Sequence, residues 1–393
     1  MSWTALLAGL VIQYAEKAFE WTDSLPLGGY TARKGAGYQP GGDELRIRVA
    51  LLGSPGGSSV AIVSIESLTV PESLVREVRR QLPDGMELFL AATHTHCAPD
   101  SQMWNDRMTF EVPGIARFRR AELDSMAKQI AGTIQSAQQS TPFAFTELHW
   151  GQASSSFSRG RRALAQPDPH RTALQLGPVE IFHFGAHATL YPESELKLRS
   201  DWPGTLMRQR PKRLALVGSI GDASPFSLGP EPGGQVSNMA SALGRRRMAG
   251  ESGMDNEPGL RIHREPIELA DPKPHPEFAR SFGVNDPLAL IAVRAFAPRE
   301  AEITAIRVGS WVLLGVPGEP TAEVGRELQA IGEERGLRVL VCSHVNGWIG
   351  YVLTPQDYQR GGYEATLSFH GPDTGPRVLE ATQRAIRVLA RPR

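Results

Sequence analysis

The chain has 393 residues, and its 42 Lys and Arg balance 42 Asp and Glu, so the formal net charge is zero. This length accommodates one large α/β domain or two ordinary ones. An apolar content of 41% is ordinary for a soluble globular protein. The balanced charge argues against nucleic acid or an anionic membrane as partner, and it does nothing to oppose homo-oligomer formation.

The cysteines and the N-terminal segment indicate in which cellular compartment the protein is expected. Two cysteines, Cys97 and Cys342, exclude a disulfide framework, and the apolar runs beside them favour buried thiols. The N-terminal stretch MSWTALLAGLVIQ is apolar, but no Lys or Arg precedes it and it is too short to span a bilayer. We therefore read it as part of the domain, and no other segment approaches transmembrane length. The sequence predicts a cytoplasmic protein.

The spacing of apolar residues and of turn residues predicts the elements in chain order. The first part of the chain contains a long loop at 22–43, a hairpin of strands at 45–52 and 60–65 turned at 53–59, a helix from Pro71 to about Leu82, and a strand at 86–92. The middle contains a helical pattern within 115–138, a strand at 145–150, an irregular Ser- and Arg-rich segment at 151–175, and strands at 179–184 and 214–220. The last part contains loop and helix within 228–260, a hairpin of strands at 303–308 and 310–316, a helix at about 321–335, a strand at 338–345, and a helix at about 376–391.

Strands and helices are intermixed in this order, with hairpins as well as crossovers. This pattern predicts the α/β class, with a mixed β-sheet core and helices packed on the faces of the sheet. No internal repeat and no linker interrupts the chain. We expect a single domain over residues 1–393.

The strand at 86–92 runs directly into His94-Thr95-His96. Side chains alternate along a strand, so these two histidines are expected on the same face. Neutral imidazole is the commonest metal ligand. Two hydrogen-bonded histidines at a strand end would give the same pattern, so this stretch alone leaves both interpretations open.

Polar turns also follow three other apolar strands. His187 follows the strand at 179–184, Asp222 and Ser224 follow the strand at 214–220, and Glu319 follows the strand at 310–316. In open α/β sheets, ligands bind outside the carboxyl ends of the strands. Histidines plus one glutamate match the ligands of a catalytic zinc site, in which one position stays open. The shared position predicts one convergent metal site at the strand ends.

Other known motifs fit less well. The metallo-β-lactamase pattern places an Asp two residues after the second His and then another His, whereas Ala98 and Pro99 follow here. The hairpin-rich order argues against a TIM-barrel amidohydrolase. The segment Gly221-Asp222-Ala223-Ser224-Pro225 is not a Gly-x-Ser-x-Gly nucleophile elbow, and its alternative interpretation is a tight turn closed by local backbone bonds.

Five segments, in matching order over residues 92–371, resemble motifs of the neutral/alkaline, non-lysosomal ceramidase family. They are ATHTHCAP at 92–99, GAHAT at 185–189, GDASP at 221–225, PGEPT at 317–321, and YVLTPQDYQRGGYEATLSFHG at 351–371. The resembling family motifs are Thr-His-Thr-His-Ser-Gly/Ala-Pro, Val-His-Ala-Thr, Gly-Asp-Val-Ser-Pro, Pro-Gly-Glu-Phe-Thr, and a Tyr-x-x-Thr segment that ends in Tyr-Glu.

The resemblance implies a ceramidase-like catalytic domain that hydrolyses an amide, or N-acyl, bond in a lipid-like small molecule, with ceramide as the named candidate. It implies one zinc ion per chain, bound by His94, His187, Glu319 and Tyr351. It also implies catalytic roles for Ser224, His96, Tyr363 and Arg159, the last as counterpart of an arginine on an Asn-Arg-Ser turn. Whether Ser224 or a zinc-bound hydroxide attacks the carbonyl stays open.

The chain also departs from the family pattern. Cys97 replaces a serine, and His370 stands where the family has a tyrosine. The family's C-terminal β-sandwich domain is expected to be absent, because the chain ends soon after the last motif. Two alternatives therefore remain. The same fold could act on another amide or an ester, in the hydrolytic or the synthetic direction, or the chain could be a non-catalytic binding protein.

Overall fold

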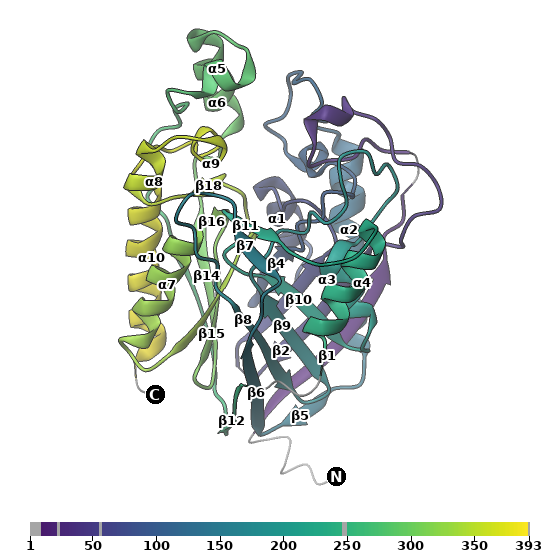
Figure 1. Ribbon diagram of the computed structural model, residues 1–393. Coiled ribbons are helices and arrows are strands. Elements are labelled where there is room, and N and C mark those ends of the chain that lie inside the picture. Colours follow the sequence, from purple (N-terminus) through teal and green to yellow (C-terminus); the bar gives the residue numbers. More distant parts are fainter. Residues whose placement is uncertain (1–8, 22–23, 55–56, 246–249, 392–393) are drawn as a thin grey trace.

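The computed structural model describes residues 9–21, 24–54, 57–245 and 250–391. Within these ranges the chain forms three large β-sheets, and helices cover the outer face of each sheet (Figure 1). Parts of four predicted features lie outside the described residues. These parts are residues 1–8 of the N-terminal stretch, residues 22–23 of the first loop, residues 55–56 of the first hairpin turn, and residues 246–249 of the predicted loop and helix within 228–260.

The first sheet has the strand order β4-β3-β2-β1-β5. Its strands are β1 (Leu10–Ala18), β2 (Arg46–Gly53), β3 (Ser59–Ile65), β4 (Met86–Ala92) and β5 (Phe143–Phe145). The predicted hairpin is confirmed, since β2 and β3 pair antiparallel, and β4 then pairs parallel to β3. Helix α1 (Glu72–Arg79) makes that crossover, and it packs with α2 (Arg120–Gln139) on the outer face of the sheet.

The second sheet has the order β10-β9-β8-β6-β12. Its strands are β6 (Glu147–Ser154), β8 (His170–Leu176), β9 (Val179–Phe184), β10 (Arg213–Val217) and β12 (Glu251–Asn256). Strands β9 and β10 run parallel, whereas the other neighbours in this sheet run antiparallel. Helices α3 (Asp201–Arg208) and α4 (Pro232–Leu243) cover its outer face.

The third sheet has the order β13-β14-β15-β17. Its strands are β13 (Leu260–Pro266), β14 (Glu302–Val308), β15 (Trp311–Gly315) and β17 (Arg338–Cys342), and helices α7 (Ala322–Glu333) and α10 (Thr374–Ala390) cover its outer face. Two short strand pairs lie at one end of the molecule, β7 (Ser158–Gly160) with β11 (Ala223–Pro225) and β16 (Glu319–Pro320) with β18 (Tyr351–Val352). The remaining helices are α5 (Phe278–Phe282), α6 (Asp286–Phe296), α8 (Pro355–Gln359) and α9 (Tyr363–Thr366).

A single apolar core joins the three sheets. Along β4, Phe89 and Ala91 face this shared core, while Leu88 and Leu90 face the helices. The same alternation in β9, β10, β15 and β17 leaves both faces of these strands buried. Burial on both faces explains why their sequences are nearly continuous apolar runs.

The α/β class with mixed strand directions is confirmed, but the expectation of one sheet was wrong. The segment at 151–175, predicted as irregular, contains β7 and most of β8, and residues 228–260 contain the strand β12 as well as a helix. Strand β12 reads Glu-Ser-Gly-Met-Asp-Asn and is largely exposed at a sheet edge, so it carries no apolar pattern. The sequence pattern also did not predict β1, β13, α3, α5, α6, α8 and α9.

Two predictions about the whole chain can be compared with the structure. Cys97 and Cys342 are both free and buried, as predicted. Within the described ranges, the structure contains no helix with the length and apolar character needed to cross a membrane.

Removing Phe89 tests the shared core. Its side chain is fully buried between the sheets. We expect Phe89→Ala to lower the free energy of unfolding by about 3–5 kcal/mol, because the ring leaves a cavity that its neighbours cannot fill. Urea unfolding measures the change. Phe143→Ala is the matched control, since Phe143 is also in a strand but 48% exposed, and it should cost about 0.5 kcal/mol. Equal losses would contradict the shared core.

Candidate metal and catalytic site

The carboxyl ends of β4, β9, β10, β15 and β17 lie at the same end of the three sheets, near β7, β11, β16 and β18, and α5, α6, α8 and α9 lie beyond them (Figure 1). Backbone contacts join the loops that follow these strands. Thr95 forms a parallel bridge with Ala188, and Glu319 is in register with Tyr351 across the β16–β18 pair. The backbone nitrogen of His187 donates to the carbonyl of Ala223 over 2.9 Å. Regular backbone pairing therefore brings distant motifs together.

Glu319 lies at the centre of this convergence. Its Oε2 atom is 3.3 Å from His187 Nε2 and 3.7 Å from His94 Nε2. The Nδ1 atoms of these rings face backbone carbonyls, His94 toward Leu68 at 2.8 Å and His187 toward Ala223 at 3.2 Å. A neutral imidazole that donates from Nδ1 keeps a lone pair on Nε2. Two nitrogen lone pairs and a carboxylate oxygen therefore face one another.

Electrostatics keep these groups in the protonation states that a cation needs. Burial, together with the nearby charge of Arg161, lowers the pKa of His187 to about 4. Burial also lowers the pKa of His94. Burial opposes ionisation of Glu319, but the surrounding imidazoles hold the pKa of this carboxyl well below its usual range. Among the described residues, Glu319 Oε2 has no hydrogen-bond donor, so the three atoms form an acceptor set suited to a cation.

The side chains of His96 and His94 lie next to each other, but the alternation of side chains along a strand, which was the expected reason, does not explain it. Strand β4 ends at Ala92 and His94 has a φ of +62°, so strand alternation does not continue through these residues. Their Nε2 atoms are nevertheless 3.2 Å apart. Gly29, with a φ of +87°, lies so close to the His96 ring that a Cβ there would be 2.6 Å from it. The loop containing Gly29 therefore fixes the position of His96.

Tyr351 is buried next to this group, in contact with an arginine that sequence analysis missed. Nη2 of Arg161 donates to the Tyr351 hydroxyl oxygen over 3.0 Å, and Nη1 lies 3.4 Å from His187 Nε2. Glu364 accepts from Nε of the same guanidinium over 2.8 Å. Arg161 lies within the segment at 151–175 that was predicted as irregular, directly after β7, and its side chain is placed by the hydrogen bonds to Tyr351 and Glu364.

Ser224, Arg159 and Tyr363 lie at the margin of the group. Ser224 directly opposes Arg159 in the β7–β11 pair, and the exposed Arg159 guanidinium lies 5.4 Å from the Phe226 ring centre. The Tyr363 ring is 6.0 Å from the Tyr351 ring and 58% exposed. No hydrogen bond joins these three side chains to the histidines within the described part of the chain.

Sequence analysis also missed His344, which follows β17. It is fully buried, its ring stacks on His94 with centres 4.1 Å apart, and its Nε2 atom lies 3.9 Å from Glu319 Oε1. The Trp348 indole donates to that same oxygen over 3.0 Å. His344 follows an apolar strand, as the predicted ligands do, and that rule could have found it.

Two overlapping groups in the described ranges could hold a metal ion, His94 with His96 and His187, and His94 with Glu319 and His344. Within each group the potential ligand atoms lie within 4.8 Å of one another. Imidazole nitrogen and carboxylate oxygen suit zinc and other first-row divalent ions. The arrangement is therefore compatible with a metal centre built on these residues.

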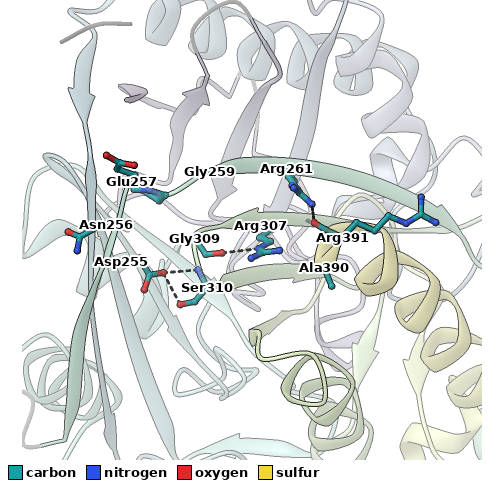
Figure 2. Close-up of a pocket in the computed structure, with 11 residues that line it drawn as sticks. Asp255, Asn256, Glu257, Gly259, Arg261, Arg307, Gly309, Ser310, Ala390 and Arg391 are labelled. Atoms are coloured by element: carbon teal, nitrogen blue, oxygen red, sulfur yellow. Dashed lines mark hydrogen bonds between the residues drawn. The ribbon is translucent and has the colours of Figure 1, made fainter. Parts of the chain in front are cut away.

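A separate hollow of about 570 Å³ lies at the opposite end of the sheets (Figure 2). It is lined by the turns after β12 and β14 and by the end of α10. The guanidinium groups of Arg261 and Arg307 both donate to the carbonyl of Leu389, which occupies part of their hydrogen-bonding capacity. None of the predicted site residues lines this hollow, so the candidate site remains the convergence at the strand ends.

Sequence comparison finds local similarity to neutral ceramidases, whereas no family model matches the chain. A segment of 117 residues is 28% identical to neutral ceramidase of Drosophila pseudoobscura pseudoobscura, covering 27% of this chain and 17% of that protein. A segment of 84 residues is 30% identical to neutral ceramidase of Mycobacterium tuberculosis (strain ATCC 25618 / H37Rv), covering 20% and 13%. The matched segments thus span less than a fifth of these relatives.

Comparison of structures extends the similarity to nearly the whole chain. A structure titled "Ceramidase complexed with C2" aligns with a TM-score of 0.82 over 97% of this chain and 75% of its own, at 16% sequence identity. Neutral ceramidase from Pseudomonas aeruginosa aligns with a TM-score of 0.78 over 98% and 75%, also at 16% identity. The chain therefore has the fold of the neutral ceramidases, as the five motifs predicted.

Proposed function

We propose that this chain is a zinc-dependent hydrolase of an amide bond in a lipid-like small molecule, with an N-acyl sphingoid base, ceramide, as the first substrate to test. The observation that carries the proposal is the buried Glu319 carboxylate, whose Oε2 atom faces the Nε2 atoms of His94 and His187 without a donor among the described residues. The similar structure and the similar sequence are both named as ceramidases, and this supports an amide as the substrate.

His94, His187, Glu319 and Tyr351 are the proposed ligands of one zinc ion. A bound zinc would polarise the amide carbonyl and lower the pKa of water at its open position. The two backbone carbonyls that face His94 and His187 Nδ1 hold the rings in the required tautomer. Arg161 holds the oxygen of Tyr351 as an acceptor, because a guanidinium only donates.

The remaining residues supply hydrogen bonds and proton transfer. Amide hydrolysis adds water across the C–N bond, so the departing nitrogen must receive a proton while negative charge develops on the carbonyl oxygen. His96 is next to His94 and its Nδ1 atom is unpaired in the described structure, so we assign it proton transfer. Tyr363 offers a hydroxyl to the oxyanion at the exposed edge of the site. We assign Ser224 a catalytic role at the carbonyl group of the amide that is cleaved.

Metal content tests the first part of the proposal. We expect purified protein to hold about one zinc per chain, and His187→Ala to lose both the metal and the activity because a ligand is removed. Elemental analysis measures zinc in each protein. His170→Ala is the control, since His170 pairs with Asp168 outside this site, and it should keep the metal. Wild-type protein without bound metal, or His187→Ala with full zinc, would contradict the proposal.

A pair of arginine variants tests which guanidinium acts at the site. We propose that Arg161 carries the role that the resemblance gave to Arg159, because Arg161 contacts Tyr351 directly. We expect Arg161→Met to lower kcat/KM by about 100-fold or more, in the range of a lost transition-state donor, and Arg159→Met by less than about tenfold. A larger loss in Arg159→Met would reverse the assignment.

The substrate is tested by comparing N-acyl sphingosines of different chain length with short-chain amides and esters. We expect release of sphingosine and fatty acid, detected by mass spectrometry, and loss of turnover in Ser224→Ala. Turnover of a smaller amide without turnover of any ceramide would exclude ceramide and leave the amidase proposal standing. Turnover of esters alone would overturn the amide assignment.

A further inference from the structure

His344 is a polar side chain in a fully buried position next to the proposed metal site. It has no exposed surface and a left-handed backbone, with a φ of +55°. Neither ring nitrogen has a hydrogen-bond partner in the described part of the chain. Burying polar atoms without partners costs free energy. A contribution to folding therefore does not explain why a histidine stands here.

The contacts of His344 involve two of the proposed zinc ligands at once. Its ring is stacked on the His94 ring, with an interplanar angle of 17° and centres 4.1 Å apart. Its Nε2 atom faces Oε1 of Glu319 at 3.9 Å. The other oxygen of that carboxylate, Oε2, is the one that faces His94 and His187. His344 thus contacts one face of the His94 ring and faces the carboxylate oxygen that does not face His94 and His187.

Direct metal binding by His344 fits this geometry poorly, although its distances from His94 and Glu319 allow it. A metal ion lies close to the plane of the imidazole that binds it, so two nearly parallel rings direct their lone pairs at different positions. A second ion would also add charge to a buried group that already contains Arg161 and has Glu319 as its shared carboxylate.

We propose that His344 is a positioning residue, which fixes the His94 ring by stacking on it and lies next to Oε1 of the Glu319 carboxylate, the oxygen that accepts from the Trp348 indole. The inference rests on the proposed metal site and adds to it a residue outside the ligand set. If His344 has this role, its side chain should increase the affinity for zinc without increasing the stability of the metal-free protein. An apolar side chain of similar size would remove the two unpaired nitrogens, and it would also remove the ring stacking that fixes the His94 ring.

The test compares His344→Leu with wild-type protein in zinc affinity, measured by competition with a chromophoric chelator, and in melting temperature of the metal-free protein. We expect zinc to bind about 10–100-fold more weakly, the usual effect of losing a residue that orients metal ligands. We expect the melting temperature to stay close to that of wild type, because removal of two unpaired buried nitrogens offsets the strain of leucine at a positive φ. The visible absorption bands of the Co²⁺-loaded protein should shift, because the ligand geometry changes.

His183→Leu is the matched control, since His183 is equally buried but uses its Nε2 atom against the carbonyl of Val341 at 2.8 Å. Its loss leaves a buried carbonyl unpaired, so we expect a lower melting temperature with zinc affinity within twofold of wild type. His344→Asn is the second variant, because asparagine adopts a positive φ readily. It should weaken zinc binding as His344→Leu does.

The outcomes separate the two proposals. If wild-type protein binds zinc and both His344 variants bind it within twofold, the positioning role is wrong and the proposed function stands. The role is equally wrong if either variant loses stability as His183→Leu does while keeping its zinc affinity. If wild-type protein binds no zinc, the proposed function fails and the positioning role with it.

Discussion

A buried carboxylate surrounded by imidazoles is the constraint on which the rest of the site depends. Glu319 is almost fully buried, and an ionised carboxylate in such a place needs compensating charge. Arg161, 3.4 Å from His187, is shared with Tyr351 and neutralised in part by Glu364. The lone pairs of His94 and His187 supply no positive charge. A divalent cation, as proposed above, would supply the missing positive charge and accept these lone pairs.

The fold provides this arrangement by ending strands of three sheets at one place. The sheets share one apolar core, so their strand ends are held in a fixed relation, and ligands carried on rigid elements are positioned more precisely than ligands on free loops. Close backbone approach matters too. A Cβ at Gly221 would lie 2.6 Å from the carbonyl oxygen of Glu319, so the turn containing Ser224 reaches the glutamate only with glycine there.

Strands that are buried on both faces could be predicted well, because both sets of alternating side chains are apolar and the sequence is a continuous apolar run. The bounds of β4 and β9 agree with the predicted 86–92 and 179–184. Strand β12 could not be predicted, because it is exposed at a sheet edge and consists largely of polar residues. Strand β8 was missed because polar residues interrupt its apolar pattern, although the strand lies inside the sheet between β6 and β9. The division into three sheets was likewise beyond the sequence, since it depends on which strands pair.

For the site, the residue types at the strand ends could be read from the sequence, and five ordered motifs predicted the ceramidase fold. The resemblance also gave His94, His187, Glu319 and Tyr351 as metal ligands, which stays a prediction; in the structure Glu319 faces both histidines and is in register with Tyr351. The same strand-end rule would have included His344, which follows β17, whereas the position of Arg161 in the site could be seen only in the folded chain, because no motif or spacing distinguishes it. Their positions follow from the β7–β11 pairing and from the stacking of loops that are far apart in the chain.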